Sequence, residues 1–307
     1  MENMYDYMYD DWSANGRETN GEKGYLKLLN RVVGGERRTD RTGTGTRSLF
    51  GAQLRFDLRD GQVPVLTTKK MAWKTCIREL LWFLRGSTDS KELEAQGVKI
   101  WQGNTTRAFL DARGLTDLPE GDIGAGYGFQ WRHFGAVYTD CYADYSGQGI
   151  DQLKYVEDLI KNDPNSRRIF MTAWNPEAID RMALPPCHVS CQFYVSQDGL
   201  SCHMYQRSAD CFLGLPFNIM SYGVLTHLLA SRAGIQAKEL VISIGDAHVY
   251  NDHLNQIEEQ YHRIPYPFPK LVLNDRLKTL DWSEMTVEDF DLDGYQCHPA
   301  IVAPMSA

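Results

Sequence analysis

The sequence predicts a single domain of the α+β class. Segments with helical periodicity and segments with strand periodicity both occur, and after the N-terminal region neither a repeat nor a linker interrupts them. The chain has 307 residues, of which 43% are hydrophobic and 23% are charged. A chain of this size can bury most of its apolar surface in one core without disulfides or a structural metal.

The first half of the chain opens with residues 1–22, which are polar, acidic and rich in Tyr, Gly and Asn, so we expect a disordered extension. The folded domain is predicted to span residues 23–307. It begins with a helix from Lys23 to Val33, which Gly34-Gly35 ends. A loop at 41–46 precedes a strand from Leu49 to Leu58, and a second helix is predicted from Ala72 to Leu84.

The second half contains residues 102–149, whose Gly, Asp, Thr and aromatic content indicates irregular structure. The turn signal Gln197-Asp198-Gly199 predicts a hairpin between two strands. The remaining tail is rich in loops and prolines. The elements predicted in this half are helices at 151–161 and 219–232 and strands at 167–174, 188–195, 200–206 and 240–244.

Charge and cysteine content narrow the class of protein. The net charge of -8 argues against a dedicated nucleic-acid binder, which needs a basic face. A few convergent arginines can still hold one small phosphate. Seven cysteines without a secretory signal indicate a reducing compartment, so we expect a cytoplasmic protein, with the nucleus or a viral host's cytoplasm as equivalent locations. No apolar run is long enough to span a bilayer.

Cys187 is the candidate nucleophile. It follows Pro185 and Pro186, which fix the local backbone, and it precedes a predicted strand. A thiol at the rim of a sheet, near His188 and arginines, can ionise readily and attack a substrate. The competing interpretation is a packed, inert cysteine, which suits Cys76, Cys141, Cys191 and Cys202.

A zinc site is a second alternative for this region. Its ligands would be Cys187, His188, Cys191, Cys202 and His203, but their spacing matches a paired-cysteine motif poorly. Strand alternation also predicts that His188 faces away from Cys191. We therefore expect no metal.

Glu79 is the candidate general acid or base. Its neighbours at helical spacing are mostly apolar, and a desolvated carboxyl has the raised pKa that proton transfer needs. The alternative is a surface glutamate paired with Arg78 or Arg85.

Several other polar residues suit a small, planar, phosphorylated ligand. Asn218 begins the helix at 219–232, where it can cap the helix or read an imide edge. His248 and Tyr250 are predicted to share one strand face, from which they can bind a sugar hydroxyl. A phosphate grip is predicted from arginines at loops and strand ends together with one hydroxyl, although each arginine taken singly also fits a solvated surface charge: Arg41, Arg167, Arg168, Arg207 and Ser208.

Eight ordered sequence blocks resemble the thymidylate synthase family. The resemblance covers about residues 23–307 and implies a mixed β-sheet flanked by helices, with a homodimer formed through the sheet. The blocks are residues 40–45, 79–83, 127–132, 166–168, 184–188, 205–210, 214–219 and 245–250.

The resemblance also implies a reaction. Cys187 would add to C6 of dUMP, and C5 would then attack the methylene of 5,10-methylenetetrahydrofolate, giving dTMP and dihydrofolate. The implied catalytic residues are Cys187, Glu79, Tyr127, Asp210 and Arg207. The implied dUMP contacts are Arg41, Gln206, Arg207, Ser208, Asp210, Asn218, His248 and Tyr250, with Arg167 and Arg168 from the partner subunit. The implied folate contacts are Ile100, Trp101, Asn104, Asp210, Leu213, Gly214, Phe217 and Ala307.

The chain departs from the family pattern at Gln102-Gly103, Ala125-Gly126, Met220 and Ala307. These changes can affect the folate side or the closure that excludes water. Water attack on the methylene intermediate, in place of hydride, gives 5-hydroxymethyl-dUMP and tetrahydrofolate, so a dUMP hydroxymethylase is the alternative enzyme. A nucleotide- or RNA-binding regulator without turnover is the non-enzymatic alternative. The retained catalytic set favours an enzyme.

Overall fold

The computed structural model describes residues 21–39 and 43–304 and confirms a single α+β domain. Its helices are α1 (Gly21–Val33), α2 (Trp73–Leu84), α3 (Ser90–Ala95), α4 (Arg107–Ala112), α5 (Tyr127–His133), α6 (Gln152–Asn162), α7 (Leu215–Arg232) and α8 (Leu254–Tyr261). Its strands are β1 (Glu36–Arg38), β2 (Thr46–Asp57), β3 (Phe170–Thr172), β4 (His188–Ser196), β5 (Gly199–Asp210), β6 (Ala237–Tyr250), β7 (Lys270–Leu273) and β8 (Phe290–Asp293).

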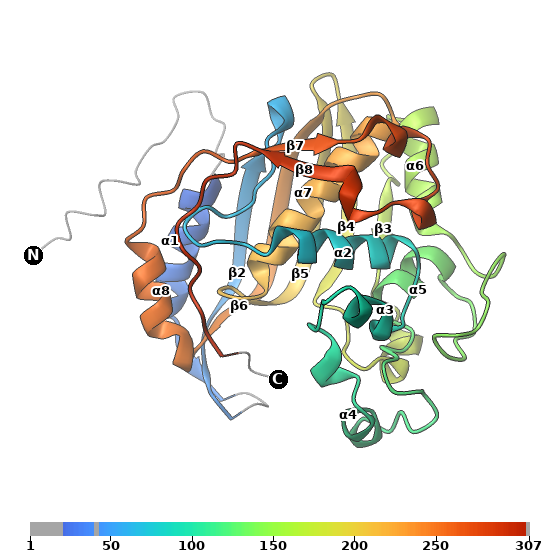
Figure 1. The fold of residues 1–307 in the computed structure, drawn as a ribbon, viewed down its shortest axis with the longest axis horizontal. Coiled ribbons are helices and arrows are strands. Elements are labelled where there is room, and N and C mark those ends of the chain that lie inside the picture. The colour runs from blue at the N-terminus through green and yellow to red at the C-terminus, as the bar shows by residue number, and fades with distance from the viewer. Residues whose placement is uncertain (1–20, 40–42, 305–307) are drawn as a thin grey trace, which may run out of the picture.

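A mixed six-stranded sheet in the order β1-β2-β6-β5-β4-β3 lies behind the helices in Figure 1. Strands β5 and β6 are parallel, and α7 connects them, because parallel neighbours need a long crossover. The other neighbouring pairs are antiparallel. The β5–β6 register sets Ser208 opposite Asp246 and Asp210 opposite His248, so predicted ligand residues from both strands meet at one end of the sheet.

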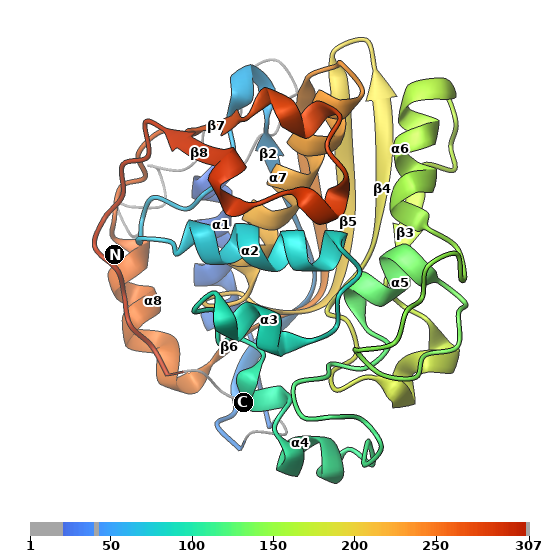
Figure 2. The same cartoon turned by 45° about the vertical axis from the view of Figure 1, so that its right-hand side comes forward.

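Helices cover one face of the sheet. Helices α1 and α7 pack on the strands and α2 packs on α7, as both views show (Figures 1 and 2). Helix α7 is buried on nearly every side, which explains why its sequence is apolar all round. The opposite face carries exposed side chains in register across neighbouring strands, among them Phe170, Gln192, His203, Tyr194 and Tyr205.

The structure differs from the predicted elements in several places, and α3, β1, β7 and β8 had no predicted counterpart. The stretch 102–149 contains α4 and α5, which have six and seven residues and are too short to show an apolar period. Strand β3 has three residues where eight were predicted, whereas β6 extends to 14 residues because it has a partner along both edges. Helix α8 lies in the tail that was predicted to be loops.

The folded chain begins earlier than predicted within the described part. Helix α1 starts at Gly21, and the buried Glu22 carboxylate accepts hydrogen bonds from the backbone N–H groups of Thr67 and Thr68. Residues 1–20 lie outside the described residues, so the disordered extension stays a prediction. No helix of the described chain is long and apolar enough to cross a membrane.

Candidate active site

Cys187 lies just before β4, and hydrogen bonds hold the backbone of its loop from two sides. Arg207 donates from Nε to the Pro186 carbonyl at 2.8 Å and from Nη2 to the Pro185 carbonyl at 2.9 Å, and Nη2 is 4.0 Å from Sγ of Cys187. The Cys187 N–H donates to the Tyr127 hydroxyl at 2.8 Å. A fixed guanidinium beside a partly exposed sulfur favours the thiolate, so the geometry suits a nucleophile.

Three of the four cysteines that were expected to be packed and inert are buried. Cys76, Cys191 and Cys202 are buried as predicted, whereas Cys141 is partly exposed because it lies in a surface loop after α5. All seven cysteines fall within the described residues, and none of them forms a disulfide. Within 21–39 and 43–304, no three His, Cys, Asp or Glu side chains lie together as metal ligands.

His188 corrects one prediction about the strand. The register shifts between His188 and Ser190, so His188 and Cys191 are both buried, where strict alternation predicted opposite faces. The ring lies 4.3 Å from that of Tyr127, and Nδ1 lies 2.9 Å from the Tyr222 hydroxyl. Burial lowers the pKa of His188 to about 3. The cation beside Cys187 is therefore Arg207, and His188 is a neutral packing partner.

Glu79 lies on α2 in the surroundings that the sequence predicted. Burial raises its pKa to about 7, opposed by a 2.9 Å hydrogen bond from the Trp101 indole N–H. The alternative of a surface ion pair with Arg78 or Arg85 is wrong, because Glu79 instead accepts the Trp101 indole N–H, and Arg85 pairs with Glu92. A carboxyl with a pKa near neutrality can both take up and release a proton.

Tyr127 links Glu79 with Cys187. Its ring stacks on Phe83 at 4.8 Å and lies 5.8 Å from the Trp101 ring, whose indole reaches Glu79. Burial holds its pKa well above the ordinary value, so the hydroxyl keeps its proton. Its φ of 28° is unusual for a residue other than glycine, as is common where a site constrains the backbone.

Two amides form the next part of the site. Gln206 donates from Nε2 to Oδ1 of Asn218 at 2.9 Å. Asn218 lies inside the first turn of α7, which begins at Leu215 after Gly214, so the predicted helix-capping role is wrong. Oε1 of Gln206 is buried without a hydrogen-bond partner among the described residues. A buried acceptor of this kind fits a site that a ligand completes.

The predicted sugar contacts lie together on β6. The His248 and Tyr250 rings are 5.6 Å apart on the same strand face, as predicted. Asp246 orients this end, because its Oδ1 accepts the Ser48 hydroxyl at 2.9 Å and lies 3.2 Å from Nδ1 of His248. Ser208 is opposite Asp246 on β5.

Asp210 shapes the turn that carries the predicted folate contacts. Its Oδ1 accepts the N–H groups of Phe212 and Leu213 at 2.9 and 3.2 Å, and its carbonyl accepts the Gly214 N–H at 3.1 Å. Nδ2 of Asn104 is a second buried atom that lacks a partner in the described chain. Ile100, Trp101, Leu213 and Phe217 are partly buried against the core.

Lys69 contacts the turn that Asp210 shapes and was not singled out from the sequence. It is buried, donates from Nζ to the Phe212 carbonyl and lies 3.8 Å above the Phe212 ring. Burial lowers its pKa to about 8, opposed by the charge of Asp210. Its sequence neighbourhood, Thr67-Thr68-Lys69-Lys70, resembles an ordinary surface charge and gave no signal.

Two of the predicted phosphate contacts, Arg167 and Arg168, lie far from Cys187 of the same chain. Arg167 and Arg168 are exposed in the loop before β3. The Arg167 carbonyl accepts a hydrogen bond from Nε2 of Gln192. Gln192 is five residues along β4 from Cys187, or roughly 17 Å in an extended strand. Arg41 and Ala307 lie outside the described residues.

The departures from the family pattern fall into two groups. Gln102 and Gly103 are exposed in the turn after Trp101, next to the predicted folate contact Asn104. Ala125, Gly126 and Met220 are buried, so they alter the packing behind the site and not its surface.

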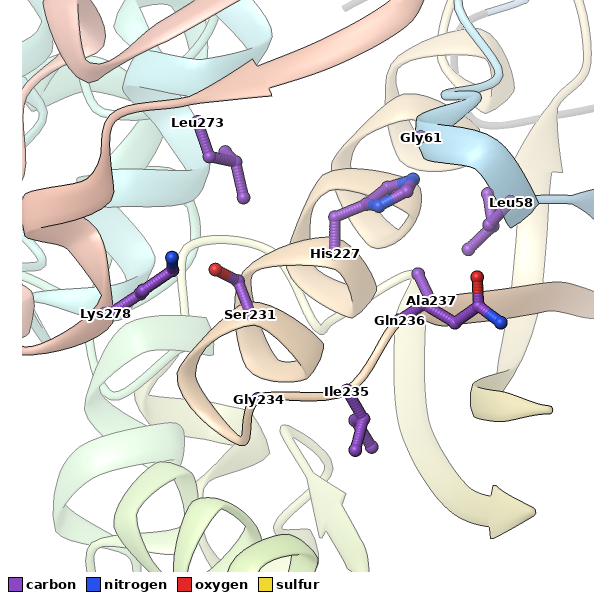
Figure 3. A pocket seen from close by; sticks show the side chains of 10 residues that line it. All are labelled: Leu58, Gly61, His227, Ser231, Gly234, Ile235, Gln236, Ala237, Leu273 and Lys278. Atoms are coloured by element: carbon purple, nitrogen blue, oxygen red, sulfur yellow. The ribbon is translucent and has the colours of Figure 1, made fainter. Parts of the chain in front are cut away.

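A surface cavity of about 360 Å³ lies away from these residues, at the C-terminal end of α7 (Figure 3). No predicted site residue lines it. Its lining is Leu58, Gly61, His227, Ser231, Gly234, Ile235, Gln236, Ala237, Leu273 and Lys278.

The fold and the site are those of an enzyme class with a cysteine positioned as nucleophile and a desolvated carboxyl suited to proton transfer. Comparison with known proteins agrees with this class. The family model described as thymidylate synthase matches residues 23–307. The chain is 50% identical over 294 residues to thymidylate synthase of Homo sapiens, covering 95% of this chain and 93% of that protein.

Two further relatives give the same result. The chain is 52% identical over 293 residues to thymidylate synthase of human herpesvirus 8, covering 95% of this chain and 86% of that protein. It is 53% identical over 293 residues to thymidylate synthase of Agaricus bisporus, covering 93% of this chain and 99% of that protein. The chain belongs to the thymidylate synthase family, whose members are folate-dependent methyltransferases.

Proposed function

We propose that this protein converts dUMP to dTMP and uses 5,10-methylenetetrahydrofolate as donor of both the carbon and the hydride, with dihydrofolate as the second product. The observation that carries the proposal is the arrangement around Cys187, whose backbone N–H donates to the Tyr127 hydroxyl and whose sulfur lies 4.0 Å from Arg207. Glu79 accepts a hydrogen bond from the Trp101 indole, which packs against the Tyr127 ring. Relatives that are about 50% identical to this chain over nearly their whole length are named thymidylate synthase.

The first half of the reaction forms two bonds. The Cys187 thiolate adds to C6 of the uracil ring, and the C5–C6 electron pair moves to C5 and O4. Gln206 and Asn218 offer amide groups that suit the imide edge of the ring. C5 then attacks the folate methylene carbon, whose bond to one folate nitrogen has opened, and Glu79 is suited to supply the proton for that opening.

The second half releases both products. A base removes the proton from C5, and Glu79 and the Tyr127 hydroxyl help to carry that proton away. The bond between the methylene carbon and the folate nitrogen then breaks. Hydride passes from tetrahydrofolate to the exocyclic methylene, the electron pair returns to the C5–C6 bond, and Cys187 leaves. The folate loses a hydride and a proton in all and becomes dihydrofolate.

The hydroxymethylase alternative is not favoured, because the relatives that match this chain over most of their length are named thymidylate synthases. One incubation with dUMP and methylenetetrahydrofolate tests the choice. We expect dihydrofolate, followed by absorbance, to form in a 1:1 ratio with a product of the mass of dTMP. A product heavier by one oxygen, without dihydrofolate, would refute the synthase assignment.

We propose further that the protein is a homodimer through the open face of its sheet. The exposed aromatic side chains of Phe170, Tyr194 and Tyr205 on this face support the proposal, since soluble monomers rarely leave such a surface uncovered. The distance along β4 between Cys187 and the loop of Arg167 and Arg168 supports a role for these arginines in the partner's phosphate site.

A cytoplasmic location, or a nuclear one, is part of the proposal. Seven cysteines that form no disulfide suit a reducing compartment. Fractionation of cells that produce the protein, with detection in the cytosolic and nuclear fractions, tests this point.

A further inference from the structure

His253 is a buried residue for which the sequence analysis named no role. It ends the turn after β6 (Asn251–His253), immediately before α8, and its side chain is fully buried. Its ring packs 5.4 Å from that of Phe212, in the turn that Asp210 shapes, and 5.6 Å from that of Tyr250. His253 therefore contacts both the predicted folate side and the predicted nucleotide side of the site.

The same side chain holds the C-terminal tail. The tail runs beside α8 in both views (Figures 1 and 2), and its earlier part is fixed where the Tyr295 hydroxyl donates to the Leu66 carbonyl and the His298 N–H donates to the Thr67 carbonyl. Nε2 of His253 lies 2.7 Å from the Pro304 carbonyl, three positions before Ala307. Because a carbonyl only accepts, Nε2 carries the proton.

Packing alone does not account for a histidine at this place. Nδ1 is buried and has no hydrogen-bond partner among the described residues. An acceptor buried in this way costs free energy, which a phenyl ring of similar shape would avoid. What the histidine provides and a phenyl ring lacks is the N–H donor to Pro304.

We propose that His253 is a positioning residue that fastens the C-terminal tail against the folate side of the site and thereby helps to keep water from the methylene intermediate. This inference rests on the proposed function. With the tail loose, water adds its oxygen to the exocyclic methylene carbon and releases a proton. The electron pair returns through C5 to the C5–C6 bond as Cys187 leaves, which gives 5-hydroxymethyl-dUMP and leaves tetrahydrofolate unoxidised.

Two variants separate the hydrogen bond from the packing. His253→Phe keeps a ring against Phe212 and Tyr250 but lacks the donor, and His253→Gln restores a donor near the Nε2 position. We expect His253→Phe to raise the KM for methylenetetrahydrofolate about fivefold to tenfold, the loss of one hydrogen bond. We also expect a larger share of hydroxymethyl product, an unchanged KM for dUMP, and recovery in His253→Gln.

A measurement without turnover keeps the inference separate from the proposed function. We expect carboxypeptidase to trim the tail of ligand-free His253→Phe several-fold faster than that of the wild type or of His253→Gln. His262→Phe, at an exposed position just after α8, is the matched control and should match the wild type. His253→Leu replaces His253→Phe should that variant fail to fold.

Equal trimming rates and equal product ratios in His253→Phe and the wild type would overturn the proposal. A His253→Gln variant that behaves like His253→Phe would overturn it as well. A wild-type protein that makes no dTMP would instead refute the proposed function, and the trimming rates would still decide the role of His253.

Discussion

At the residue scale, the chemistry depends on how Arg207 holds the Cys187 loop. Its guanidinium bonds two successive proline carbonyls and still places Nη2 at 4.0 Å from the sulfur. The same side chain lies over the Trp174 ring at 5.6 Å. A planar fork can make all of these contacts at once, whereas an ammonium group acts as a single point charge. Arg207 is thus needed for both the position and the charge at the thiol.

Arg207→Lys should therefore lower kcat/KM about 100-fold, the scale of a misplaced catalytic group. The rate at which iodoacetamide alkylates Cys187, followed by peptide mass at neutral pH, should fall as well. Arg181→Lys is a suitable control, because Arg181 pairs with Asp117 on the surface. An alkylation rate equal to that of the wild type would show that Arg207 does not activate the thiol.

Glu79 gives a prediction about stability and pH. Its pKa is about 7 in the folded protein against an ordinary value of 4.5. Between these values the folded chain retains a proton that the unfolded chain has lost, so stability falls as pH rises through this window. Below 4.5 both states are protonated, and the carboxyl has no such effect.

Glu79→Gln should therefore become more stable than the wild type as pH rises from 5 to 8, by up to about 1–3 kcal/mol. Its kcat should fall by about 10²–10⁴, as expected on removal of a general acid or base. Urea unfolding at several pH values measures the first effect, with the exposed Glu92→Gln as control. A stability difference independent of pH would contradict the raised pKa.

At the element scale, the sequence predicted the long elements and missed the short ones. Helices α1, α2, α6 and α7 and the β4–β5 hairpin follow from apolar periodicity and turn residues. Helices α4, α5 and α8 span eight residues or fewer, where packing against neighbours outweighs local preference. The bulge at His188 could not be predicted from the sequence either, because one added residue in a strand does not change its composition detectably.

The hairpin turn at Gly199 gives an element-scale prediction. Its φ is +126°, and a Cβ atom there would lie 2.3 Å from the Gln236 carbonyl oxygen, which is backbone and cannot move aside. Gly199→Ala should cost about 2–4 kcal/mol of stability, and the folded fraction should keep its activity.

Gly97→Ala is the control for this prediction. Gly97 also has a positive φ, +78°, but a Cβ atom added there would meet no other atom within 4 Å, so we expect a loss of about 1 kcal/mol. Thermal unfolding of both variants makes the comparison. Equal losses would mean that the close approach to Gln236 does not fix the hairpin.

At the scale of the whole molecule, the site predicted from the sequence is largely brought together. Cys187, Glu79, Tyr127, Arg207 and Asn218 come from separate segments that the sheet and α7 unite. Lys69 and Trp174 were missed, because their roles come from burial and from contacts far along the chain. Arg167 and Arg168 remain apart from the thiol in one chain, so their proposed role at the phosphate site depends on the proposed second subunit.

Hybrid dimers test that requirement. One subunit carries Cys187→Ala and the other carries Arg167→Ala with Arg168→Ala. If the arginines act across the interface, one of the two sites in each hybrid is intact. Random mixing in equal amounts makes half of the dimers hybrids, so about a quarter of wild-type activity should return. If no activity returns, the arginines act within their own chain; if the Arg167→Ala/Arg168→Ala dimer is active by itself, the arginines are not needed.

The proposed reaction depends on a covalent bond between Cys187 and C6 of the uracil ring. The nucleotide 5-fluoro-dUMP tests it directly, because fluorine at C5 cannot leave as a proton does and the reaction stalls before the methylene is released. After incubation with methylenetetrahydrofolate and a denaturing quench, the mass of the protein should rise by one nucleotide and one folate, on the peptide that contains Cys187. An unchanged mass, or the same adduct on Cys187→Ala, would contradict covalent catalysis by Cys187.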